Sequence, residues 1–178
     1  MAGVCLVSGA AGLVWLRGHL AWPLFLLAGA AALLHEGRVP AWGLPAVASA
    51  AIVVAIAAAL LHAYWAAGGR RWFAAAVPAR EDGGPRFEPG PLACLGVVAA
   101  LLAFVALLSW SLLATPPWWV RAATGLAAVL LTARAIGDGR QVGFTKRRRS
   151  TAFARLDDRV YTPLMVTLLF GALSALVG

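Results

Sequence analysis

The chain has 178 residues, of which 62% are apolar and 12% are charged, and its formal net charge is +8. A soluble globular protein is about half apolar and about a quarter charged, so this composition excludes a disordered chain and argues against a soluble domain. The apolar residues lie in long blocks, which are typical of membrane-spanning helices. We expect an all-α integral membrane protein. We expect no nucleic-acid partner, because a nucleic-acid binder would not need so much uncharged sequence.

Residues 1–38 form an N-terminal apolar segment that is interrupted by Arg17. One interpretation is a single tilted helix over residues 12–34, with Arg17 reaching the membrane interface. Other interpretations are a pair of short helices, a signal peptide that is removed, and a start codon assigned too early. The apolar residues before Arg17 argue against a signal peptide, so we favour one extra helix in front of the core.

Residues 39–178 contain four stretches that are long and apolar enough for membrane helices, which need about 20 residues each. These stretches are residues 44–65, 91–113, 118–136 and 161–177. The last stretch is short, so we expect its helix to extend back toward Asp158 or to be little tilted. The sequence therefore predicts a four-helix transmembrane core.

Lysine and arginine are concentrated in two of the segments between the spans. Residues 66–90 carry four arginines, residues 134–160 carry seven arginines and one lysine, and residues 114–120 carry none. Short basic loops stay on the cytoplasmic side of a membrane. We expect both basic loops to face the cytoplasm and the C-terminus to lie outside. The excess of arginine over lysine and the abundance of alanine favour a GC-rich bacterial source, and hence the bacterial inner membrane.

Tryptophans fall at the ends of the predicted spans, where their amphipathic rings anchor helices at the membrane interface. The tryptophans at these ends are Trp42, Trp65, Trp72, Trp118 and Trp119. Trp110 lies inside the second span, where we expect it to pack against another helix.

The second basic loop has three glycines, Gly137, Gly139 and Gly143, followed by the basic run at residues 146–149. The glycines predict tight turns and close approach of the backbone. No strand precedes them, so a dinucleotide site is not expected. The basic run attracts anionic lipid at roughly 1 kcal/mol per basic residue, but we favour the simpler explanation that basic loops stay on the cytoplasmic side.

Asp157 and Asp158 precede the fourth span, and Pro163 follows them. A carboxylate is favoured at a helix N-terminus, where it meets free N–H groups, and proline is favoured in the first turn. We therefore expect one of these aspartates to cap the fourth helix.

His62 is an ionisable residue about one turn from the inner end of the first span. Ionisable residues inside membrane segments are costly and indicate function by default. Arg134, Asp138, Asp157 and Tyr161 are predicted at the same depth. Together these groups could form a polar cluster for proton transfer or for binding a headgroup. Alternatively, His62 holds two helices together through a hydrogen bond.

The three histidines are spread over separate segments, and the two cysteines are far apart. Metal binding needs three or four convergent ligands, so we expect no metal site. No nucleophile, protease or cofactor motif is present, so we expect no cofactor.

Three spaced motifs resemble those of a family of small, multi-helix bacterial inner-membrane proteins that is catalogued as a domain of unknown function. They are HAYWAAGG at residues 62–69, RAIGDGRQVGFTK at residues 134–146 and YTPL at residues 161–164. The resemblance covers roughly residue 44 to the C-terminus and leaves residues 1–38 outside the family pattern. It implies four core helices and no assigned activity.

Two functions are consistent with these features. The first is binding of an anionic lipid or similar amphiphile at the inner-face cluster. The alternative is a small membrane-embedded enzyme acting on a lipid or isoprenoid, with His62 or Asp138 as general acid or base. We favour binding, because no reactive constellation is recognisable. The candidate binding residues are His62, Tyr64, Trp65, Arg134, Asp138, Arg140, Lys146, Asp157 and Tyr161.

Overall fold

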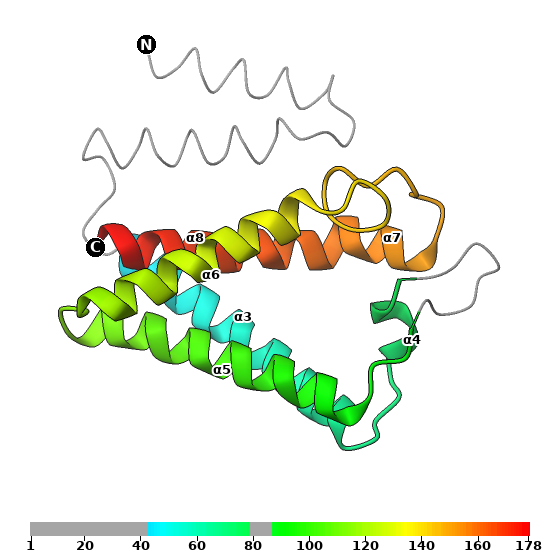
Figure 1. Cartoon of the computed structure of the whole chain (residues 1–178), viewed down its shortest axis with the longest axis horizontal. Coiled ribbons are helices and arrows are strands. Elements are labelled where there is room, and N and C mark those ends of the chain that lie inside the picture. The colour runs from blue at the N-terminus through cyan, green and yellow to red at the C-terminus, as the bar shows by residue number, and fades with distance from the viewer. Residues whose placement is uncertain (1–42, 79–86) are drawn as a thin grey trace, which may run out of the picture. The chain divides into compact units, whose positions relative to one another are not determined.

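Four helices in the described part of the chain are long and apolar enough to cross a membrane (Figure 1). The computed structural model describes residues 43–78 and 87–178, and these residues contain no β-strand. The predicted all-α membrane fold is therefore confirmed. The helix expected within residues 1–38 lies outside the described residues.

The first three spans have nearly the predicted bounds. Helix α3 covers Gly43–Ala66, α5 covers Pro91–Leu113 and α6 covers Trp118–Ile136. Local sequence explains the ends of α5, because Pro91 stands in its first turn and Pro116 and Pro117 follow its last residues.

The fourth span begins at Ala152, earlier than predicted. It consists of α7 (Ala152–Leu156), the π-helical turn η1 (Asp157–Tyr161) and α8 (Thr162–Val177). Thr151 caps it, since its side chain accepts a hydrogen bond from the N–H of Ala154 at 3.0 Å. The prediction that Asp157 or Asp158 caps this helix is wrong, because both lie inside it.

Helices α3 and α8 pack through small side chains. The buried residues of α3 are Ala48, Ala51, Ala55, Ala59 and Trp65. A Cβ atom added to Gly171 of α8 would collide with Cβ of Ala51. The larger side chains of α3, including Val53, Ile56 and Leu60, are exposed instead. This arrangement is expected in a bilayer, where helices associate by close van der Waals contact and not by exclusion of water.

Helix α3 lies between α5 and α8, and α6 packs mainly on α8. The beginning of α6 lies beside the end of α8, because Arg121 donates a hydrogen bond to the carbonyl oxygen of Leu176 at 3.0 Å. In Figure 1, α3 and α5 diverge from α6 and α8 toward the opposite end. That end carries α4, α7 and the loop at residues 137–151, where the charged and polar residues of the candidate site lie.

The first basic loop folds against the end of α3. Gly68 has φ +93 and ends α3, as two adjacent glycines predict. The indole N–H of Trp65 donates to the carbonyl oxygen of Arg71 at 2.9 Å, and its ring packs edge-on against Phe73. Trp65 is therefore buried, and its predicted role as an interface anchor is wrong. Trp72 is 70% exposed and has a left-handed backbone with φ 61.

Candidate functional site

The loop at residues 137–151 returns onto the end of α6. The N–H of Phe144 donates to the carbonyl oxygen of Ala135 at 2.9 Å, and the N–H of Thr145 donates to that of Ile136 at 3.0 Å. These bonds satisfy carbonyl groups that a helix end otherwise leaves unpaired. A Cβ atom on Gly143 would lie 2.6 Å from the oxygen of Ala135. The predicted close approach of the backbone is confirmed at Gly137 and Gly143 but not at Gly139, which has open space around it.

Asp138 holds the turn of this loop. Its Oδ1 atom accepts hydrogen bonds from the backbone N–H groups of Arg140, Gln141 and Val142 at 2.9, 2.7 and 3.0 Å. Partial desolvation raises the pKa of Asp138, but the three N–H groups outweigh it and the pKa lies below its ordinary value. Asp138 is thus engaged with its own loop.

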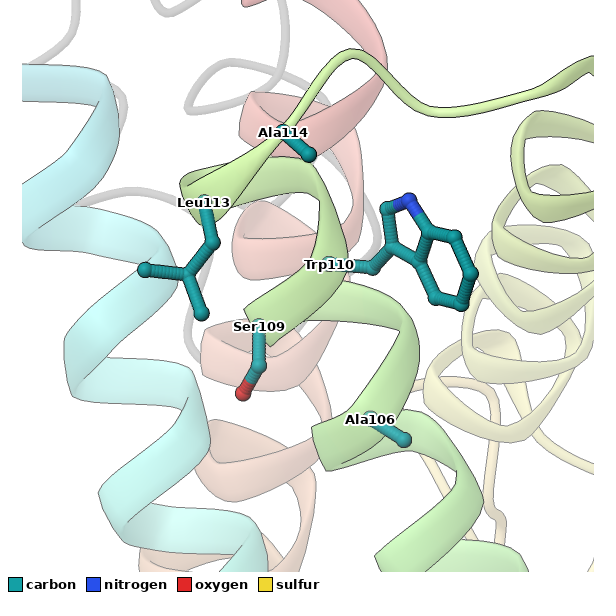
Figure 2. Close-up of a pocket in the computed structure, with 5 residues that line it drawn as sticks. All are labelled: Ala106, Ser109, Trp110, Leu113 and Ala114. Atoms are coloured by element: carbon teal, nitrogen blue, oxygen red, sulfur yellow. The ribbon is translucent and has the colours of Figure 1, made fainter.

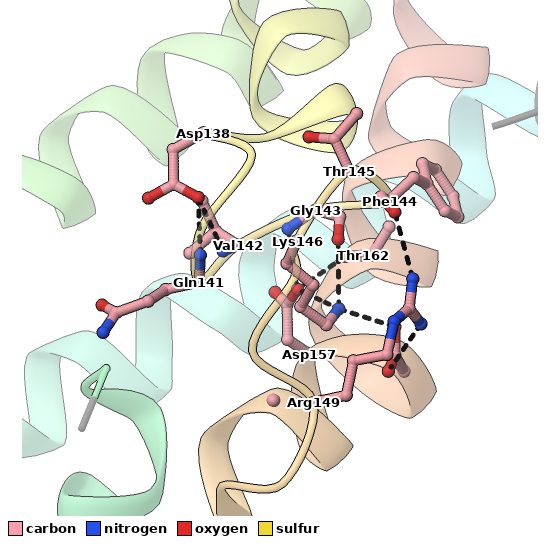
Figure 3. Close-up of polar contacts among 12 residues, drawn as sticks. Asp138, Gln141, Val142, Gly143, Phe144, Thr145, Lys146, Arg149, Asp157 and Thr162 are labelled. Atoms are coloured by element: carbon pink, nitrogen blue, oxygen red, sulfur yellow. Dashed lines mark hydrogen bonds and ion pairs between the residues drawn. The ribbon is translucent and has the colours of Figure 1, made fainter. Parts of the chain in front are cut away.

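Asp157 is the centre of the polar contacts and is 0% exposed (Figure 3). Its Oδ1 atom accepts a hydrogen bond from Nη2 of Arg134 at 2.8 Å. Its Oδ2 atom accepts from Nζ of Lys146 at 2.8 Å, the N–H of Gly143 at 2.8 Å and Oγ1 of Thr162 at 3.1 Å. The carboxylate therefore joins α6, the loop and the start of α8.

Lys146 is buried beside Asp157, with 2% of the residue exposed. Its ammonium donates to the carbonyl oxygen of Gly143 at 3.1 Å, to Oδ2 of Asp157 at 2.8 Å and to Oδ1 of Asp158 at 2.6 Å. An ammonium has three donors, and all three are used here. A buried charge is tolerated only when it is paired in this way.

Arg134 differs from Lys146 because it is only partly satisfied. One of its nitrogens, Nη2, pairs with Asp157. The other, Nη1, is buried and has no hydrogen-bond partner among the described residues. The side chain as a whole is 33% exposed. Buried polar atoms are nearly always hydrogen-bonded, so this nitrogen stands out in an otherwise closed network.

The remaining cations of the loop and of the following helix lie on the surface. These exposed residues are Arg140, Arg147, Arg148, Arg149, Arg155 and Arg159. We call them the exposed arginine set. Arg134 and Lys146, which are half-buried and buried, thus pair with Asp157, whereas the other six cations are exposed, and of these Arg149 also lies 3.6 Å from Asp158.

The other candidate residues form a second group at the end of α3. Nδ1 of His62 donates to the carbonyl oxygen of Ala58 at 2.8 Å, and the ring contacts that of Trp65 at 4.9 Å between centroids. The ring of Tyr64 lies against Gly69, where an added Cβ would collide with it. No hydrogen bond or ring contact of the described residues joins His62 to Arg134.

Tyr161 connects the fourth span to the first basic loop. Its hydroxyl donates to the carbonyl oxygen of Ala75, in α4 (Phe73–Ala76), at 3.2 Å, and its ring packs on Phe153. Of the nine candidate residues, Arg134 and Lys146 both bond to Asp157, and His62 contacts Trp65. Sequence reasoning missed two ligands of Asp157, the N–H of Gly143 and the hydroxyl of Thr162. A backbone donor leaves no signal in sequence, whereas Thr162 belongs to the YTPL motif at residues 161–164 and could have been considered on that ground.

A shallow apolar pocket of about 300 Å³ lies near the end of α5 that leads to α6 (Figure 2). Its lining residues are Ala106, Ser109, Trp110, Leu113 and Ala114. Trp110 extends from α5 and packs edge-on against Trp119 of α6, as its position inside the span predicts. The pocket offers no charged group. Among residues 43–78 and 87–178, no three His, Cys, Asp or Glu side chains converge to hold a metal ion.

A family model described as "Protein of unknown function (DUF3995)" matches residues 55–173, which is more than half of the chain. The matched range contains both basic loops and every residue of the network around Asp157. No curated protein and no solved structure matches the chain.

Proposed function

The chain belongs to the DUF3995 family of proteins of unknown function, and we propose that it binds anionic lipid through the loop at residues 137–151. The observation that supports this proposal is the separation of the cations. Lys146 and Arg134 pair with aspartates inside the network, so they hold the loop in place. The exposed arginine set is held outward on that fixed scaffold.

The loop lies at a depth where lipid headgroups are within reach. It follows directly on α6, which ends at Ile136, and it precedes the span that begins at Ala152. Basic residues near an anionic surface contribute about 1 kcal/mol each. The exposed arginine set would then supply binding of several kcal/mol, which is enough to select anionic over zwitterionic lipid.

We place this loop and the first basic loop on the cytoplasmic side of a bacterial inner membrane. Two observations support this orientation. Both loops are basic, and they lie at the same end of the helices, since Tyr161 bonds to Ala75. The C-terminus, beside the beginning of α6, would then lie outside.

The test compares two pairs of exposed arginines in the full chain. The loop variant is Arg140→Gln with Arg147→Gln, and the matched control is Arg70→Gln with Arg71→Gln in the first basic loop. Both remove two charges from the same side of the protein. Native mass spectrometry with phosphatidylglycerol and phosphatidylcholine measures bound lipid.

We expect the wild type and the control to prefer phosphatidylglycerol and the loop variant to lose most of that preference. An equal loss of the preference for phosphatidylglycerol in both variants would mean that the charges of the loop serve only to orient the protein in the membrane. A wild type without any preference for phosphatidylglycerol would also reject the proposal.

A further inference from the structure

We propose that Trp72 docks its indole ring into the headgroup layer of the leaflet on the side of the basic loops. This lipid contact is distinct from the exposed arginine set, because it uses an uncharged side chain of the first basic loop. Its starting point is the combination of two features in one residue. Trp72 is 70% exposed, and among residues 43–78 and 87–178 it is the one residue other than glycine that has a positive φ, at 61.

The left-handed backbone of Trp72 costs free energy, because a side chain there comes too close to the following carbonyl group. Such residues persist only where the surrounding structure determines their conformation, and they cluster at functional positions. Glycine adopts the same φ without this cost. The indole also makes no hydrogen bond or ring contact in the part of the chain that the structure describes. A bulky side chain at a strained and exposed position points to a contact outside the chain.

Contacts on both sides of Trp72 hold it in this conformation. The carbonyl oxygen of Arg71 accepts a hydrogen bond from the indole N–H of Trp65 at 2.9 Å. The ring of Phe73 packs edge-on against Trp65, with 5.6 Å between the centroids. The carbonyl oxygen of Trp72 itself accepts from the N–H of Ala75 at 3.1 Å. Both neighbours of Trp72 thus contact Trp65, and the side chain between them remains exposed.

The same contacts place Trp72 at the depth of a membrane surface. Trp65 lies in the last turn of α3, which ends at Ala66. Ala75 accepts a hydrogen bond from the hydroxyl of Tyr161, which belongs to the fourth span. A loop fixed to the ends of two spans lies where a bilayer has its headgroups. Tryptophan is enriched in that layer, because its ring is apolar and its N–H is polar. This depth favours lipid over a protein as the partner of the indole.

The test locates the indole by fluorine NMR on the full chain in phosphatidylcholine nanodiscs. All tryptophans carry a fluorine atom, and the resonance of Trp72 is the one that is absent from Trp72→Phe or from Trp72→Tyr. Trp65 is the internal control, because it lies at the end of the same loop but is buried, and its resonance is identified in the same way. Broadening is measured with a lipid that is spin-labelled near its glycerol ester and with a water-soluble gadolinium chelate.

We expect the spin-labelled lipid to broaden the resonance of Trp72 more strongly than the chelate does, and to broaden that of Trp65 little. Stronger broadening of the Trp72 resonance by the chelate would place the indole in water. Protection of this resonance from both reagents would place the indole under protein, either a second copy or another part of the chain. Each of these two results overturns the proposal.

Two variants measure what the contact contributes to stability in phosphatidylcholine bicelles. Trp72→Ala removes the indole and keeps the strained backbone, whereas Trp72→Gly removes both. We expect Trp72→Ala to unfold at a lower temperature than the wild type. The folding equilibrium constant of Trp72→Gly should exceed that of Trp72→Ala about tenfold, because glycine relieves the strain.

Two results of this comparison would overturn the proposal. If Trp72→Ala were as stable as the wild type, the indole would contribute no contact. If the two variants were equally stable, position 72 would carry no strain. Neither variant changes the exposed arginine set, so the preference for phosphatidylglycerol should persist in both. A loss of that preference in the wild type would reject the proposed function and leave the docking of Trp72 untouched.

Discussion

Nζ of Lys146 lies 2.8 Å from Oδ2 of Asp157, and neither side chain is accessible to solvent. Removing one partner of such a pair leaves a buried charge without compensation, which costs about 3–5 kcal/mol. We predict a loss of this size in the free energy of unfolding for Asp157→Asn, measured by reversible unfolding in detergent. The carboxylate of Asp157 also serves Arg134 and Gly143, so several contacts weaken together.

Asp158→Asn is the matched control for this prediction. Asp158 bonds to the same ammonium, but its side chain is 39% exposed, so solvent screens its charge and its removal should cost less than that of Asp157. A loss for Asp158→Asn that equals or exceeds the loss for Asp157→Asn would contradict the central role of Asp157.

The glycines of the loop differ in what a side chain would meet. Gly143 has φ +73, and an added Cβ would lie 2.6 Å from the backbone at Ala135 and Gly137. Gly139 has φ +70 but open space around it. We predict that Gly139→Ala costs about 1–2 kcal/mol of stability, the usual cost of a left-handed residue with a side chain. Gly143→Ala should cost clearly more, because the backbone must also move.

Thermal unfolding of both variants in the same detergent checks this difference. Gly143→Ala should also loosen the bond from its N–H to Asp157, which faster amide exchange at residue 143 would report. Equal melting temperatures for the two variants would show that the loop moves aside without cost.

Stability should depend on pH through Asp138. Desolvation raises the pKa of the Asp138 carboxyl, but hydrogen bonds from three backbone N–H groups hold this pKa below its ordinary value of 3.8. The stabilisation is therefore fully present above 3.8 and is lost as pH falls through the folded pKa. We predict that the wild type melts above Asp138→Asn at pH values over about 4, and that the difference shrinks at lower pH. An amide resembles the protonated carboxyl, so a difference that stays constant with pH would contradict the assignment.

The proposed orientation predicts which positions are accessible from outside the cell. Single cysteines at Thr115 and Gly178, in a background without the native cysteines, should react with an impermeant maleimide in intact cells. A cysteine at Ser150 should react only after the membrane is permeabilised. Labelling of the cysteine at Ser150 in intact cells would show that the orientation is the opposite of the proposed one.

Much of the fold could be predicted from hydropathy and from proline. The bounds of α5 and α6 are as predicted because a turn with two prolines separates two uncharged or nearly uncharged blocks. The fourth span was predicted too short, because Asp157 and Asp158 are typical of a helix N-terminus. They continue it because Lys146 compensates the charge of both aspartates, and Asp157, which also pairs with Arg134, is buried. These are tertiary contacts, which no local pattern encodes.

The candidate site was predicted only from the depth of each residue in the membrane. Depth does not determine which helices pack on one another. His62 and Arg134 lie near the same end of their helices, but α3 packs on α5 and α8, while α6 packs mainly on α8. The sequence identified Arg134, Lys146 and Asp157 as polar groups near one membrane face. It did not indicate that Lys146 would be buried, since Lys146 begins a run of four basic residues.

Up to Leu60, the buried residues of helix α3 are all alanines and its valine, isoleucine and leucine side chains are at least partly exposed, so size rather than polarity distinguishes the packed face there. A water-soluble redesign of this bundle would follow from that rule. Polar residues would replace the exposed Val47, Val53, Ile56 and Leu60, while the buried alanines would stay as they are. Close packing of α3 on α8 would survive the change of solvent, because it depends on how near the two backbones approach.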